Sequence, residues 1–153
     1  MQRTLPAAGY EADFALWVAE QAAALREGRF VDVDAANVID ELEGLIKRDR
    51  RSVRRRLALV AMHLLKLEFQ PERATRSWRN TIRVQARAVE RILADSPSLR
   101  REMPDFVAEA YADARQDAAG ETGLPIGTFP QAPTPGFERA LAAVLAGNDN
   151  FEL

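Results

Sequence analysis

The sequence predicts an all-α protein, a single-domain helical bundle of four to five helices with one long central helix. Two observations carry this prediction. Apolar residues recur at three- and four-residue spacing along most of the chain, which is the period of one helical face. The segment Leu57–Phe69 is apolar on nearly all of its faces, and a helix of that kind is normally enclosed by other helices.

The composition is that of one soluble globular domain. The chain has 153 residues, of which 47% are hydrophobic and 29% charged. We expect one domain over residues 1–153, with a loosely ordered lead at 1–9 and a loosely ordered tail at 146–153.

The chain has no cysteine and one histidine, which excludes disulfides, thiolate metal sites and a histidine-pair metal site within one chain. We expect no catalytic residue set, no metal and no cofactor. The N-terminus lacks an apolar signal segment, and the apolar run Leu57–Phe69 is too short to span a bilayer. The expected location is the cytoplasm, away from membranes.

Two helices are predicted in the first half of the chain. The first covers about Glu11–Glu27 and stops at Gly28. The second runs unbroken over Ala35–Phe69 and ends before Pro71, with a kink near Gly44 or the Lys47–Arg51 cluster as the alternative. The apolar residues that these helices are expected to bury are Tyr10, Phe14, Trp17, Leu25, Val38, Leu42, Leu45, Val53, Leu57, Val60, Leu64 and Leu67.

The third predicted helix ends near Leu93 and has Thr75 or Ser77 as its N-cap. Its expected buried residues are Trp78, Ile82, Val89, Ile92 and Leu93. Its opposite face carries a row of five arginines, Arg76, Arg79, Arg83, Arg87 and Arg91. Like charges at this spacing each destabilise a helix by about 0.2–0.5 kcal/mol, so the row needs a compensating partner.

The fourth helix is predicted to end near Ala119, with a kink or restart at Pro104, and the fifth to cover Pro135–Leu145. The fourth helix is expected to bury Leu99, Met103, Phe106, Ala110 and Ala114. It also carries an acidic stripe, Glu102, Asp105, Glu109, Asp113 and Asp117. We interpret this stripe as the partner of the arginine row, within or between subunits.

Charge is unevenly distributed. Residues 44–94 hold fourteen Lys/Arg and four Asp/Glu, whereas the whole chain has a net charge of −2. The densest part is Lys47–Arg56, and its candidate basic patch comprises Lys47, Arg48, Arg51, Arg54 and Arg55. A solvated helix surface is the ordinary interpretation of such a segment, and the alternative is a patch for RNA, DNA or an acidic protein.

A candidate polar site follows from one lane of the long helix. His63, Lys66 and Gln70 are three and then four residues apart, so they share one helical face, and we group Ser77 with them. An imidazole beside an ammonium group can bind an anion or transfer protons. The favoured interpretation is structural, because no nucleophile or second carboxylate lies at a diagnostic spacing.

Several motifs resemble those of a bacterial family, domain of unknown function 29. They are Tyr10-Glu-Ala-Asp-Phe14, Asp40-Glu-Leu-Glu43, His63-Leu-Leu-Lys66, Gln70-Pro-Glu72, Ser77-Trp78, Thr81-Ile82, Asp95-Ser-Pro-Ser-Leu-Arg100, Glu109-Ala-Tyr-Ala-Asp113, Glu121-Thr-Gly-Leu-Pro125 and Phe129-Pro130. The resemblance covers nearly the whole chain. It implies an α-helical bundle and assigns no activity. Pro104 departs from the uninterrupted helix that the resemblance implies there.

Three functions remain open from the sequence. The favoured one is a non-enzymatic module for protein–protein contacts that forms a homo-oligomer. The second is binding of a nucleic acid or phosphate ligand through Lys47–Arg56 and the arginine row. The third and least favoured is an enzyme centred on His63.

Overall fold

The protein is an all-α helical bundle. A computed structural model describes residues 9–153, and these contain five α-helices, four short 3₁₀ turns and no strand. The helices are α1 (Phe14–Arg26), α2 (Ala35–Phe69), α3 (Arg76–Asp95), α4 (Met103–Thr122) and α5 (Pro135–Leu145). None of the described helices combines the length and apolarity needed to cross a membrane.

The chain divides into two compact units, Met1–Arg48 and Asp49–Leu153, which we call the N-terminal and C-terminal units. The N-terminal unit is described only from residue 9, so nearly all of the predicted lead lies outside the described residues. The expectation of one domain over the whole chain stays a prediction.

Capping side chains and prolines account for the helix ends. Asp13 accepts a hydrogen bond from the Leu16 amide, so α1 begins at Phe14 and not three residues earlier as predicted. Thr75, one of the two predicted caps, accepts from the Trp78 amide. A 3₁₀ turn over Pro97–Glu102 precedes α4, so Pro104 lies in the first turn of a restarted helix. The predicted bounds of α2 and α5 are confirmed.

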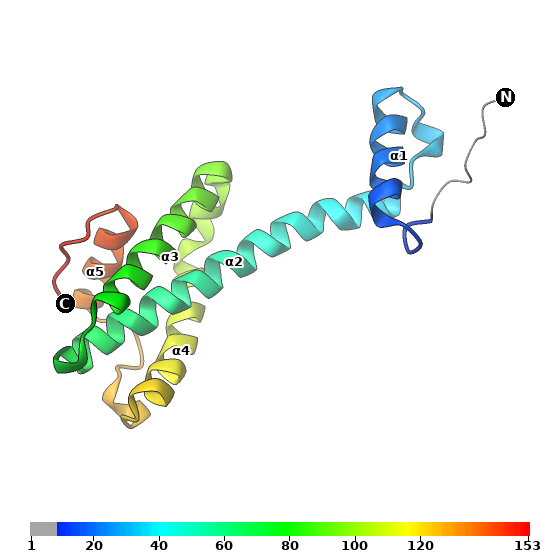
Figure 1. The fold of residues 1–153 in the computed structure, drawn as a ribbon. Coiled ribbons are helices and arrows are strands. Elements are labelled where there is room, and N and C mark those ends of the chain that lie inside the picture. Colours follow the sequence, from blue (N-terminus) through cyan, green and yellow to red (C-terminus); the bar gives the residue numbers. More distant parts are fainter. Residues whose placement is uncertain (1–8) are drawn as a thin grey trace. The chain divides into compact units, whose positions relative to one another are not determined.

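The core of the C-terminal unit is built on the second half of α2. Figure 1 shows α3, α4 and α5 arranged around this segment. Its side chains with no more than 1% exposure are Val53, Leu57, Val60, Leu64 and Leu65. They belong to one apolar cluster with side chains of the other three helices. The segment predicted to be enclosed is therefore enclosed, and Phe151 of the predicted loose tail packs against the same cluster.

The N-terminal unit buries much less. Among residues 9–48 only Trp17 and Ala24 are buried. The exposures of Phe14 and Leu25 on α1 are 49% and 45%, and those of Leu42 and Leu45 on α2 are 59% and 52%. The prediction that these four side chains are core residues is wrong, because helical periodicity identifies an apolar face but not whether another element covers it. In the C-terminal unit, Trp78 is only partly buried.

Candidate functional site

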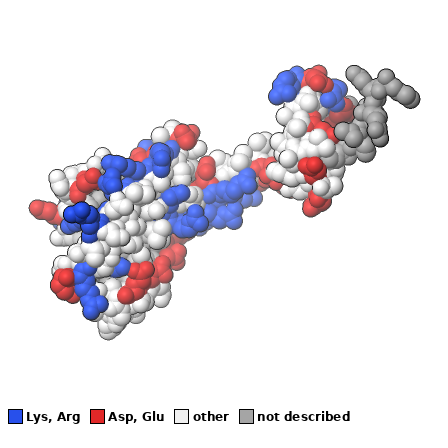
Figure 2. Space-filling model, viewed as in Figure 1, with Lys and Arg blue, Asp and Glu red and all other residues white. Residues whose placement is uncertain are grey.

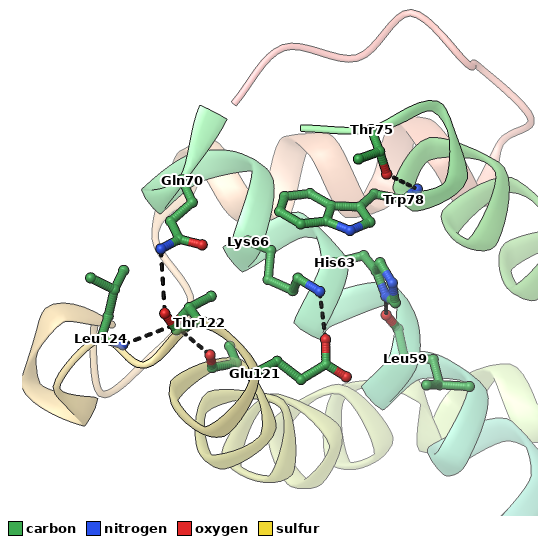
Figure 3. A network of polar contacts seen from close by, with 10 residues as sticks. Leu59, His63, Lys66, Gln70, Thr75, Trp78, Glu121, Thr122 and Leu124 are labelled. Atoms are coloured by element: carbon green, nitrogen blue, oxygen red, sulfur yellow. Dashed lines mark hydrogen bonds and ion pairs between the residues drawn. The ribbon is translucent and has the colours of Figure 1, made fainter. Parts of the chain in front are cut away.

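The structure brings three of the four predicted polar-site residues into one network (Figure 3). Lys66 is only 7% exposed, and its ammonium group lies 2.5 Å from a carboxylate oxygen of Glu121 at the end of α4. The same ammonium group lies 4.3 Å from the centre of the Trp78 ring, a cation–π distance. Gln70 donates to the carbonyl of Thr122 at 3.5 Å. The network therefore joins α2, α3 and α4.

His63 lies on the same face of α2, and its ring meets the edge of Trp78 at 6.5 Å between centroids. Its Nδ1 lies 2.9 Å from the carbonyl oxygen of Leu59, which can only accept, so Nδ1 carries the proton. Burial lowers the pKa of His63 and nearby Lys66 lowers it further, against opposing effects of the hydrogen bond with the Leu59 carbonyl and of Glu121. The imidazole is therefore neutral at pH 7.

Ser77 does not join this network. It is exposed, and its side chain makes no hydrogen bond with another described residue. Two α4 residues that were not predicted complete the network, Glu121 and Thr122. The available signal was their shared motif, Glu121-Thr-Gly-Leu-Pro125, but no spacing rule connects it with a helix 55 residues earlier.

The network has the chemistry of a structural junction. The Lys66 ammonium group is occupied by a carboxylate on one side and an aromatic ring on the other, so it is not a free amine. The proton on His63 Nδ1 is directed at a backbone carbonyl. In the described residues no cluster of three or more His, Asp or Glu side chains is arranged to hold a metal ion.

The acidic stripe of α4 pairs with α2 and not with α3. Arg50 forms two hydrogen bonds with Glu102, at 2.8 and 2.9 Å, and Arg54 lies 2.5 Å from Glu109. The interpretation that the arginine row on α3 is the partner of this stripe is therefore wrong within one chain, and pairing between subunits stays a prediction. The error arose because two complementary stripes on consecutive helices do not establish that those faces meet.

Lys and Arg gather along the middle of α2, with acidic side chains of α4 nearby (Figure 2). Both of these α4 carboxylates are at least one-third exposed, so the pairs lie at the surface. A groove of about 530 Å³ between α2 and α4 has the same combination of basic side chains on α2 and acidic side chains on α4. Its charged lining residues are Arg51, Arg54, Arg55, Glu109, Asp113 and Asp117. Within the C-terminal unit the predicted basic patch is thus partly neutralised by α4.

The arginine row on α3 makes no ion pair within residues 9–153. Arg83 donates to the side chain of Asn80, and Arg79 lies over the ring of Phe151 at 5.2 Å. Arg87 and Arg91 line an open groove of about 720 Å³ together with Val84. None of the five cations of the row therefore has a carboxylate partner among the described residues.

The N-terminal unit holds a second kind of surface. A groove of about 390 Å³ lies between α1 and the first half of α2. The residues that line it are mostly apolar: Phe14, Trp17, Val18, Gln21, Ala22, Leu25, Val38, Glu41, Leu42, Leu45 and Arg48. This surface was not predicted from the sequence, because most of these side chains were expected to lie in the core. The available signal was α1 itself, in which only Glu20, Gln21 and Arg26 are polar.

Residues 9–144 match a family described as Domain of unknown function DUF29. No curated protein matches the chain, and no solved structure does. The family match covers nearly the whole chain.

We expect NMR titration of His63 to give a pKa below the ordinary value of 6.5, because burial and Lys66 both disfavour its charged form. Below pH 6.5 the unfolded chain then binds a proton that the folded chain does not. The stability should therefore decrease as the pH decreases from 6.5 through the lowered pKa. His63→Leu should destabilise by less than about 1 kcal/mol, since the Leu59 carbonyl keeps its helical hydrogen bond. A pKa at or above 6.5 would contradict this account.

Charge reversal at the α2–α4 contact should show coupling. We expect Arg50→Glu and Glu102→Arg each to lower the urea midpoint of unfolding, and the double variant to recover part of the loss. The matched control is Arg83→Glu with Asp113→Arg, which reverses the same charges on faces that do not meet. Additive losses at Arg50 and Glu102, or recovery in the control, would count against the contact.

Proposed function

We propose a function for this chain, which belongs to the DUF29 family: it is a non-enzymatic α-helical module for protein–protein interaction that works as a homo-oligomer. One observation carries the proposal. Of thirteen exposed large apolar side chains in the described residues, ten lie in residues 9–48 and three in residues 49–153. The exposed apolar surface is therefore concentrated in the unit that has almost no core of its own.

Physical reasoning connects this concentration with binding. Monomeric soluble proteins rarely expose contiguous apolar patches larger than a few hundred Å², and larger patches mark interaction sites. Here α1 and the first half of α2 share an apolar groove, and residues 9–48 bury only two side chains. Covering that groove with another protein removes apolar surface from water, which is the main driving force for association.

Binding is favoured over catalysis by the state of the polar network. Lys66 and Gln70 are each engaged with α4, and His63 with its own helix. A catalytic group has to reach substrate, and these groups are directed at the protein. We expect the module to act in the cytoplasm.

Affinity capture tests the proposal. With the tagged chain as bait in nuclease-treated extract, we expect Leu42→Ser combined with Leu45→Ser to lose the proteins that the wild-type chain retains. Both side chains are more than half exposed, so the fold should persist, and circular dichroism checks this. The matched control Ile126→Ser changes an exposed side chain of the C-terminal unit and should retain the same proteins. Identical captured sets from all three baits would reject the proposal.

A second candidate function is binding of a nucleic acid or phosphate ligand. The observation that favours it is the arginine row of α3, whose cations have no ion pair within residues 9–153. Five cations on one face can follow a phosphate backbone. The segment Lys47–Arg56 supports it less well, because Arg50 and Arg54 are already paired with α4.

Titration with labelled RNA and DNA distinguishes the two functions. Under the interaction proposal we expect dissociation constants in the non-specific range, about 10⁻⁴–10⁻⁶ M at physiological salt. Tighter binding that falls steeply with salt, and that Arg87→Glu with Arg91→Glu abolishes, would establish the second function instead.

A further inference from the structure

Helix α1 has an unusual surface for a helix at the outside of a protein. Ten of its thirteen residues are apolar, yet only Trp17 and Ala24 are buried. A helix that is apolar nearly all round is normally enclosed. Among residues 9–48 no element encloses α1 in this way.

The exposed residues of α1 form one face with an internal pattern. At 3.6 residues per turn, six of them fall within about 120° of the helix circumference. They are Phe14, Ala15, Val18, Ala22, Leu25 and Arg26, and all six are exposed. Glu20, at the middle of the helix, points to the opposite side. Large and small side chains therefore alternate on a face that has no carboxylate.

We propose that this face binds the same face of a second copy of the chain, with the two α1 helices antiparallel about a twofold axis at residue 20. The inference rests on the proposed interaction function and names its partner. Antiparallel pairing about residue 20 places Val18 opposite Ala22 and Ala15 opposite Leu25. In these two pairs a large side chain meets a small one, which lets two helices approach closely. The twofold axis repeats each pair.

The charges on the α1 face itself are compatible with a second copy, and the charge of the whole unit disfavours a membrane. The third pair places the Arg26 guanidinium against the ring of Phe14, a cation–π partner for a cation with no ion pair within residues 9–153. Antiparallel helices also align their dipoles favourably. Residues 9–48 hold nine Asp/Glu and four Lys/Arg, a net charge of −5, which disfavours an anionic membrane surface as the occupant. On the pairing face itself Arg26 is the one charge, so the two copies do not bring carboxylates together there.

The available area is sufficient for a dimer. A half-exposed Leu, Ile or Phe side chain offers roughly 80–100 Å². The seven exposed large side chains of α1 and the first half of α2 other than Leu16 therefore offer on the order of 560–700 Å² per chain, and the exposed Ala15, Ala22 and Arg26 add to this area. Each partner in a standard stable interface contributes about 800 Å². The adjacent face of α2, with Leu42 and Leu45, continues the α1 face through the shared groove. Two hairpins joined in this way form a four-helix bundle.

Sedimentation equilibrium of the full chain tests the pairing. We expect the wild-type chain, of 17.0 kDa, to sediment as a dimer. Ala22→Glu should raise the dimer dissociation constant at least tenfold, because it buries an unpaired charge at the interface while keeping a good helix former. The matched control Leu16→Glu introduces the same charge on the opposite side of α1, where Leu16 is 38% exposed, and should leave the dimer unchanged. Equal effects of the two variants would overturn the pairing.

Cross-linking tests the register without a change of charge. The chain has no cysteine, so introduced thiols have no background. Mixed Val18→Cys and Ala22→Cys chains should form a disulfide between the two different variants faster than either variant alone, since positions 18 and 22 face each other across the axis. Leu16→Cys mixed with Ala22→Cys should not. Equal rates in all mixtures would overturn the proposed register.

Two further outcomes separate this inference from the function on which it rests. If the wild-type chain is monomeric at about 100 μM, while Leu42→Ser with Leu45→Ser still loses captured proteins, the second-copy inference is overturned and the interaction function stands. If the chain is monomeric and that variant loses nothing, both are overturned.

Discussion

The structure depends on the burial of one helical segment on all of its faces. From Leu57 to Leu67, α2 presents apolar side chains on nearly all of its faces, and most of them are removed from water. Three helices around the segment satisfy that requirement, which explains why α3, α4 and α5 belong to one apolar cluster. The same enclosure sets the conditions for Lys66, the one cation buried within the segment.

Because Lys66 is enclosed, its charge destabilises the fold unless it is paired, and its two partners connect α2 with α3 and α4. An ammonium group transferred from water to a protein interior is destabilising by several kcal/mol in order of magnitude unless it is paired. Glu121 and Trp78 supply the pairing from α4 and α3. An ion pair therefore joins the end of α4 to α2, and a cation–π contact joins the start of α3 to α2. The polar lane that first suggested an enzyme is better explained by this requirement.

The bounds of most helices could be predicted from the sequence, whereas the contacts between helices could not. The bounds Ala35–Phe69 and Pro135–Leu145 were predictable because prolines and caps act locally. The position of Glu121 beside Lys66 was not, since it depends on how two helices 55 residues apart meet. The exposure of Leu42 was unpredictable for the same reason.

The mistaken pairing of the α3 arginines with α4 has a related physical cause. A charge pattern indicates which partners a helical face can bind, but the burial of apolar faces determines which helices are in contact. In this chain the apolar face of α4 packs in the cluster around α2, so its carboxylates meet Arg50 and Arg54. The candidate polar residues could be located on one helical face from spacing alone, whereas their partners required the packed structure.

The unbroken course of α2 across the boundary between the two units has a kinetic consequence. Starting a helix is unfavourable, but extending one adds a hydrogen bond for each residue that is fixed. Once the C-terminal unit has folded, the first half of α2 can therefore grow from an existing helix end without a new nucleation step. In the monomeric chain α1 has no such template and only two buried side chains, so we expect it to form last and open first. Amide hydrogens within α1 would accordingly exchange with solvent long before those between Val53 and Leu67.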